Sequence, residues 1–61
     1  MNTPKFSIGQ TVVVWDGMRS EFVNGIVKDV VFHKSHNKFS YSIAITEEYV
    51  FDEDEIKRDG F

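Results

Sequence analysis

Apolar residues alternate with polar ones in short runs that glycines and polar turns separate, and this pattern restricts the chain to strands. The alternation is clearest at residues 39–45, where every second position is apolar: Phe39, Tyr41, Ile43 and Ile45. A period of two places such residues on one face of a strand, whereas a helix repeats them every three or four positions. Because no segment keeps a helical period, we predict an all-β domain of short strands, each with one buried face.

The length of the chain limits how that sheet is stabilised. With 61 residues, the chain supports one domain, spanning residues 1–61, and a domain of this size buries only about 60% of the surface that its unfolded chain exposes. There is no cysteine, so disulfides and thiolate metal sites are excluded. We therefore expect curvature and closure of the sheet to supply the core.

The first strand is expected at residues 11–15. Its alternation places Val12 and Val14 inside, and Val13 and Trp15 on the opposite face. A tryptophan exposed at the end of a strand is a hint of a recognition surface, although Trp15 folded over one end of the sheet is an equal alternative.

Asn24 and Gly25 have two interpretations. The pair is a typical hairpin turn, but a glycine at this place also allows a strand to begin at a sharp bend. We prefer the bend, with a long second strand at residues 26–33. Val27 and Val30 are three positions apart, which predicts a bulge between them.

The second half of the chain shows two turns and a cap. Residues 33–38 are polar and form a predicted hairpin loop, and residues 46–48 form a tight turn into a fourth strand at 49–51. Asp52 and Glu55 have the spacing of a capping box. We expect one helical turn there, followed by Ile56 inside the sheet and a short last strand.

Three motifs together resemble the frame of an SH3-like barrel, and they span nearly the whole chain: Phe6-x-x-Gly9-x-x-Val12-x-Val14, Gly25-x-Val27-x-x-Val30 and Phe51-Asp52-Glu53-Asp54-Glu55-Ile56. The chain is similar to the small bacterial and phage versions and to KOW and Tudor-like barrels. The resemblance implies a five-stranded barrel with one short helical turn before the last strand. It also implies a binding module, for a peptide, RNA, DNA or another protein subunit, without selecting the ligand.

Two branches of that superfold are less well matched. Recognition of proline-rich peptides would require a paired tryptophan and a Pro-x-x-Tyr motif, but the chain's only tryptophan is Trp15 and its only proline is Pro4. A cage for methylated ammonium groups needs several convergent aromatics and an acid, and the spacing of the aromatics does not establish such convergence.

The chain has nine aromatic side chains, more than so small a domain can bury. We expect Phe6, Phe22, Phe51 and either Phe39 or Tyr41 to fill the interior. Four of the other rings form the predicted protein-binding patch: Trp15, Phe32, Tyr49 and Phe61. The alternative is that these rings cover the ends of the barrel as an extension of the core.

Charge defines two other candidate surfaces. A basic group around the predicted hairpin loop is suited to nucleic-acid phosphates: Lys28, Lys34, His36 and Lys38. The net charge of -3 argues against a general nucleic-acid binder. An acidic stretch follows at residues 47–55, and residues 52–55 offer a third interpretation, an inhibitor that occupies a basic site on a nucleic-acid enzyme.

The remaining function classes lack their residue patterns. We find no nucleophile with a nearby base, no phosphate-binding glycine loop and no segment long enough to span a bilayer. His33 and His36 with Asp29 make a poor metal site, and no cofactor is expected. The sequence therefore predicts a cytoplasmic, non-enzymatic module that binds a protein partner, as in small bacterial or phage accessory proteins, with a KOW-like nucleic-acid module as the alternative.

Overall fold

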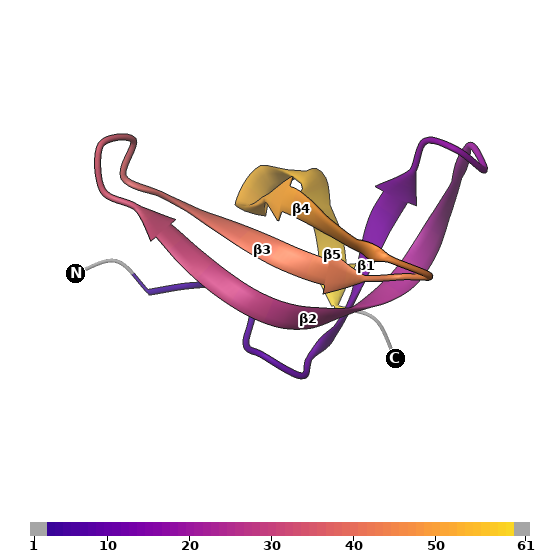
Figure 1. Cartoon of the computed structure of the whole chain (residues 1–61), viewed down its shortest axis with the longest axis horizontal. Helices are drawn as coiled ribbons and strands as arrows, with labels where there is room; N and C mark the ends of the chain where they lie inside the picture. Colours follow the sequence, from indigo (N-terminus) through magenta and orange to yellow (C-terminus); the bar gives the residue numbers. More distant parts are fainter. Residues whose placement is uncertain (1–2, 60–61) are drawn as a thin grey trace.

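Five antiparallel strands form one sheet, in the computed structural model of this chain, which describes residues 3–59 and the side chains of 3–57. The elements in chain order are β1 (Thr11–Asp16), β2 (Glu21–His33), β3 (Lys38–Ala44), β4 (Glu48–Asp52), the 3-10 turn η1 (Glu53–Glu55) and β5 (Ile56–Asp59). The order across the sheet is β4-β3-β2-β1-β5 (Figure 1). The predictions of an all-β domain and of one helical turn before the last strand are confirmed.

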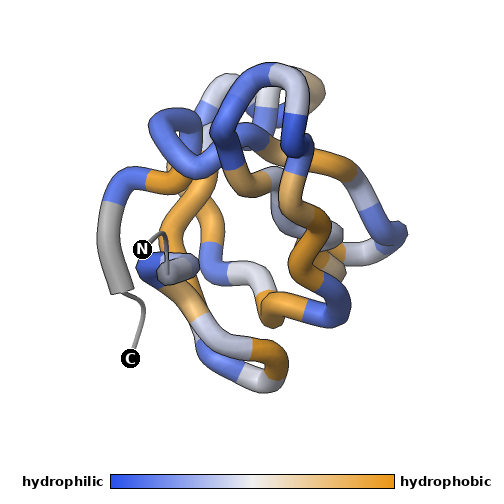
Figure 2. Tube along the Cα trace, turned by 90° about the vertical axis from the view of Figure 1, so that its left-hand side faces the viewer, coloured by the Kyte–Doolittle hydropathy of each residue, from blue (hydrophilic) through white to orange (hydrophobic). Residues whose placement is uncertain are grey.

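The sheet is strongly curled, but it is open. β4 and β5 are its two edges, and the ladders found in residues 3–59 do not join them. Closure into a barrel, which the sequence predicted, is therefore not confirmed. In Figure 2 the trace curls around a central region, and many of its hydrophilic stretches lie at the turns.

The curl depends on β2, which bends in the middle. Residues 21–26 of this strand pair with β1, and residues 26–33 pair with β3. At the bend, a Cβ on Gly25 would overlap the Cγ2 atom of Ile43 and lie 3.2 Å from the carbonyl oxygen of Ala44. A bulge follows between Val27 and Asp29. The predicted bulge is confirmed, and the alternative of a hairpin at Asn24 is wrong. The prediction that a strand begins at residue 26 is also wrong, because β2 already pairs with β1 from Glu21 and only changes its neighbour near Gly25.

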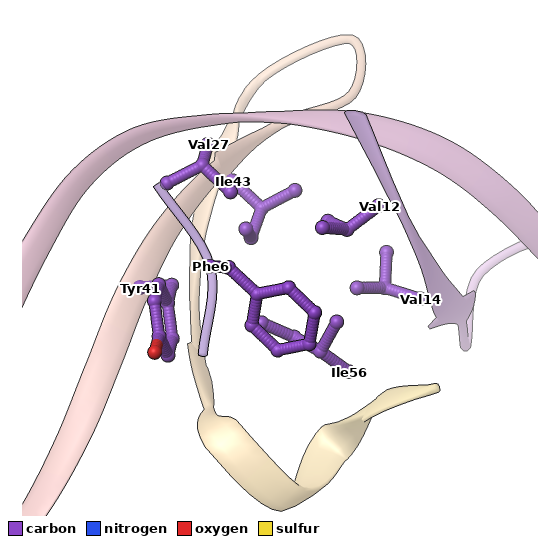
Figure 3. Packing of buried hydrophobic residues seen from close by; sticks show 7 residues of the cluster. All are labelled: Phe6, Val12, Val14, Val27, Tyr41, Ile43 and Ile56. Carbon is purple, nitrogen blue, oxygen red and sulfur yellow. The ribbon is translucent and has the colours of Figure 1, made fainter. Parts of the chain in front are cut away.

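The core lies on the concave face of the sheet. It contains seven buried side chains (Figure 3): Phe6, Val12, Val14, Val27, Tyr41, Ile43 and Ile56. Phe39, Ile45 and Phe51 pack against this cluster while remaining partly exposed. The alternation predicted for 39–45 and the inward positions of Val12 and Val14 are confirmed.

Two residues of the first hairpin depart from the sequence prediction. Phe22 was expected inside, but its side chain is 54% exposed because the register sets it opposite Trp15, on the convex face. Val13 also belongs to that face, yet it is buried at a point where β1 has a paired strand on each side, β2 and β5. Both differences arise from strand pairing, which the alternation does not specify.

The segment before β1 crosses the concave face and is held there by backbone hydrogen bonds. The N–H of Gly9 donates to the carbonyl oxygen of Val27 at 2.7 Å, and the N–H of Val27 donates to that of Gln10 at 2.9 Å. Gly9 has a φ of 91°, a left-handed conformation that favours glycine. The ring of Phe6 meets that of Tyr41 edge to face, with centroids 5.5 Å apart.

A hydrogen-bonded junction joins this segment to β3 and η1. The hydroxyl of Tyr41 donates to Oε2 of Glu53 at 2.5 Å. The N–H of Lys5 donates to the Tyr41 hydroxyl oxygen at 3.1 Å and to the same Oε2 of Glu53 at 3.2 Å. Burial of the phenol, and then its bond to Glu53, raise the pKa of Tyr41 to about 12. The neutral phenol is therefore the form that the fold favours.

The turn η1 carries its own cap. The N–H of Asp52 donates to Oε1 of Glu55 at 2.8 Å, and these two residues form the predicted capping box. Ile56, the next residue, enters the core. No helix in the described part of the chain is long and apolar enough to cross a membrane.

Replacing Gly25 tests the bend. We expect Gly25→Ala to lower the free energy of unfolding by about 1–3 kcal/mol, because the new methyl group must displace Ile43 or the backbone of β3. A Cβ on Gly17 meets nothing within 4 Å, so Gly17→Ala is the matched control. Urea denaturation measures both, and equal stabilities of the two variants would contradict a close approach at Gly25.

The Tyr41 junction predicts a loss of stability in alkali. Because the folded pKa of about 12 exceeds the ordinary value of 10.0, the contribution of Tyr41 is complete below pH 10.0 and is lost as the pH rises toward 12. We expect this loss to reach about 1–3 kcal/mol and to be absent from Tyr41→Phe. Denaturation curves across this range measure it, with Tyr49→Phe as the control. A parallel decline in the wild type and Tyr41→Phe would assign the effect to another group.

Candidate functional site

An apolar hollow of about 400 Å³ opens where the turns after β1 and after β3 meet. We call it the end hollow. The end of β1 and the following turn contribute Trp15, Asp16 and Met18. The segment leading into β4, and β4 itself, contribute Ile45, Tyr49, Val50 and Phe51, and η1 contributes Glu55. The hollow therefore combines two parts of the chain that are far apart in the sequence, residues 15–18 and residues 45–55.

The turn between β1 and β2 places Met18 at the rim. Oδ1 of Asp16 accepts hydrogen bonds from the N–H groups of Met18 at 3.0 Å and Arg19 at 3.3 Å, as is typical of an Asp that starts a turn. Ser20 completes the reversal with a φ of 53°. The side chain of Met18 is 92% exposed as a result.

The aromatic walls are about half exposed. Trp15 is 46% exposed and Tyr49 is 44% exposed. Trp15 is braced by Phe22, whose ring lies edge to face with a centroid distance of 4.9 Å. The hydroxyl of Tyr49 donates to Oε2 of Glu47 at 3.3 Å. Rings that are fixed from one side and open on the other provide contact area at a low entropic cost.

The four rings predicted as a binding patch do not form one surface. Trp15 and Tyr49 line the end hollow together. Phe32 instead lies near the β2–β3 turn, against Phe39 at a centroid distance of 4.9 Å, and Phe61 falls outside the described residues. The sequence prediction missed Met18 and Val50, two apolar residues that are largely exposed. The Asp16-Gly17 turn signal was the available clue to Met18.

Carboxylates give the end hollow a negative character. Asp16 and Glu55 are among its lining residues, and none of the lining residues in the described part of the chain is basic. The pKa of the exposed Tyr49 phenol is raised, chiefly by the charge of Glu47 and to a lesser degree by that of Asp16. Arg19 approaches Asp16, with Nε 3.8 Å from Oδ2, and is itself largely exposed.

The basic residues predicted as a nucleic-acid surface are accompanied by acids. Lys34 and His36 lie in the β2–β3 turn, Lys38 begins β3, and Lys28 lies apart from them at the bulge of β2. Lys38 shares one hollow of about 190 Å³ with Asp52, Glu53 and Asp54. It shares a second, of about 310 Å³, with both histidines and Asp52. The acidic turn thus offsets the basic loop, although the two are separate in sequence.

A serine, a histidine and an aspartate meet beside this turn, but in the wrong order for a hydrolase. Nε2 of His33 lies 2.8 Å from Oγ of Ser40, and that hydroxyl donates to Oδ1 of Asp52 at 3.2 Å. A hydrolytic triad places the histidine between the other two, so that it accepts the serine proton. Here the serine is central, and its hydroxyl donates a hydrogen bond to the carboxylate. The arrangement therefore joins strands and does not activate a nucleophile.

Ser40 is buried, although the alternation predicted for residues 39–45 puts it on the face opposite the core. The register does put it on the convex face, opposite Asp52 and diagonal to His33, and these two partners help to cover it. Within residues 3–57, no three His, Asp or Glu side chains are grouped so as to hold a metal ion.

Comparisons of the chain with models of known families, with curated proteins and with solved structures find no match. The site is therefore interpreted from its own geometry.

The bridging role of Ser40 is testable. We expect Ser40→Ala to cost about 0.5–1.5 kcal/mol of unfolding free energy, because one buried hydroxyl that satisfies two partners is lost. Ser42→Ala, on the same face of the same strand, should change stability by less than about 0.5 kcal/mol. Thermal denaturation of both variants measures this difference. If Ser42→Ala were the more harmful, the bridge would have no structural role.

Proposed function

We propose that this chain is a non-enzymatic protein-interaction module that holds a segment of a partner protein in the end hollow. The observation that carries the proposal is the collection of exposed apolar side chains there. Val50 is 71% exposed, and it lines the hollow with Trp15, Met18 and Tyr49. Aromatic and methionine side chains grouped in a concave surface are typical of protein interfaces.

The edge of the sheet supports this function. β4 provides three lining residues, and within residues 3–59 it has one strand neighbour, β3. An edge strand offers backbone groups to which an extended segment can add. A partner segment that lies along β4 would pass the mouth of the hollow and insert a side chain.

We also propose that the curled sheet is an SH3-like barrel left open between its edge strands. The strand order and the position of η1 between β4 and β5 support this assignment, as do the three motifs that frame the core. The superfold is used by many binding modules, so the assignment agrees with an interaction role without selecting a ligand.

The two competing functions receive less support. For a KOW-like nucleic-acid module, the acidic side chains of η1 beside Lys38 would repel phosphates. For an acidic inhibitor that uses residues 52–55, the carboxylates of Glu53 and Glu55 are already engaged within the fold.

Selection from a library of displayed random peptides tests the proposal without knowledge of the partner. We expect the wild-type chain to select peptides that alter the fluorescence of Trp15. Tyr49→Ala should weaken their binding about tenfold or more, as expected for a ring in the centre of an interface. Phe32→Ala, which removes an equally exposed ring far from the hollow, is the matched control and should change affinity less than about twofold.

A parallel titration with single-stranded and duplex oligonucleotides at two salt concentrations tests the alternative. Binding that falls steeply with salt and is abolished by Lys34→Glu would contradict the proposal and favour a nucleic-acid module. Peptides that bind Tyr49→Ala as well as the wild type would also contradict it.

A further inference from the structure

The end hollow combines apolar walls with the carboxylates of Asp16 and Glu55, each of which uses one oxygen to accept a backbone hydrogen bond of its own turn. The Asp16 side chain is only 16% exposed, and Glu55 lines the same hollow. An apolar side chain entering the hollow would remove water from these groups and provide no hydrogen bond in return, which is costly. An acidic or phosphorylated side chain would meet like charge.

Asp16 has one oxygen committed and one in a weaker contact. Oδ1 accepts the two backbone N–H groups of the turn. Oδ2 has a contact with Nε of Arg19 at 3.8 Å, longer than a hydrogen bond, and the Arg19 side chain is 56% exposed. Arg19 therefore makes only a long contact with Oδ2, and a guanidinium from a partner could approach this oxygen more closely.

We propose that the partner segment inserts an arginine side chain into the end hollow. Its guanidinium would lie against the ring of Tyr49 and pair with the carboxylate of Asp16. A planar guanidinium can stack on an aromatic face and donate to a carboxylate at the same time, whereas the ammonium of lysine is a more strongly hydrated point charge. This inference rests on the proposed function and adds the chemical class of the occupant.

The closing experiment uses the peptides selected on the wild-type chain. We expect an arginine at a constant position in those peptides whose binding depends on Tyr49. Replacing that arginine by citrulline, a neutral side chain of nearly the same shape, should weaken binding about tenfold or more. Replacement by lysine should weaken it by a smaller factor, about threefold to fivefold.

Asp16→Asn is the informative change on this chain, because Asn retains an oxygen that can accept the two turn N–H groups while it removes the charge. It should weaken the arginine peptide about fivefold or more and leave the citrulline peptide within about twofold of its wild-type affinity. Asp54→Asn changes the net charge equally at an exposed site outside the hollow, and it should leave both peptides unaffected. Thermal denaturation confirms that each variant is folded.

The outcomes separate the inference from the function on which it rests. If peptides depend on Tyr49 but carry no constant arginine, or if citrulline or lysine binds equally well, the arginine assignment is overturned and the hollow remains a binding site. If no selected peptide depends on Tyr49, the proposed function fails and this inference fails with it.

Discussion

β2 must serve two neighbours that face different directions, and the rest of the structure depends on how it bends. One strand of 13 residues pairs with β1 through its first half and with β3 through its second. A flat sheet of this size could not enclose a core, because each strand has only one apolar face. The bend at Gly25 and the bulge after Val27 turn those faces toward one another. The side chains of β1, β3 and β5 then meet on the concave side.

Two carboxylates of η1 hold the fold together, and Asp16 has a different place in it. Glu53 holds Tyr41 and the backbone of Lys5, and Glu55 caps the turn that it ends. These bonds close the side of the core where β4 and β5 are not paired. At the end hollow, by contrast, Asp16 orders a turn with one oxygen and keeps the other near the opening. Glu53 therefore serves the fold, whereas Asp16 is the carboxylate that the proposed arginine would meet, so the two can be changed separately.

Local patterns predicted much of this fold, and strand pairing accounts for what they missed. Alternation at 39–45, the bulge after Val27 and the capping box at Asp52 each depend on a few adjacent residues, so the sequence was sufficient. The environments of Val13, Phe22 and Ser40 depend on which residue lies opposite in the neighbouring strand. One-face alternation contains no such information.

The site was predictable only in fragments. Trp15 and Tyr49 were expected to be exposed, but their shared hollow arises because the turn after β1, strand β4 and η1 converge in space. Phe32 had the same local signature and lies near the opposite turn. The pairing of basic Lys38 with the acids of η1 is likewise a product of the fold. Exposure can be estimated from sequence periodicity, whereas convergence requires the topology.

The central claim is that this chain recognises its partner through the end hollow, and hydrogen–deuterium exchange of the chain with a tightly bound selected peptide tests it most directly. The account predicts new protection at residues 15–18 and 48–51, where the hollow and the edge of β4 lie, and unchanged exchange at residues 34–37. Protection centred on the β2–β3 turn, with none in β4, would contradict it.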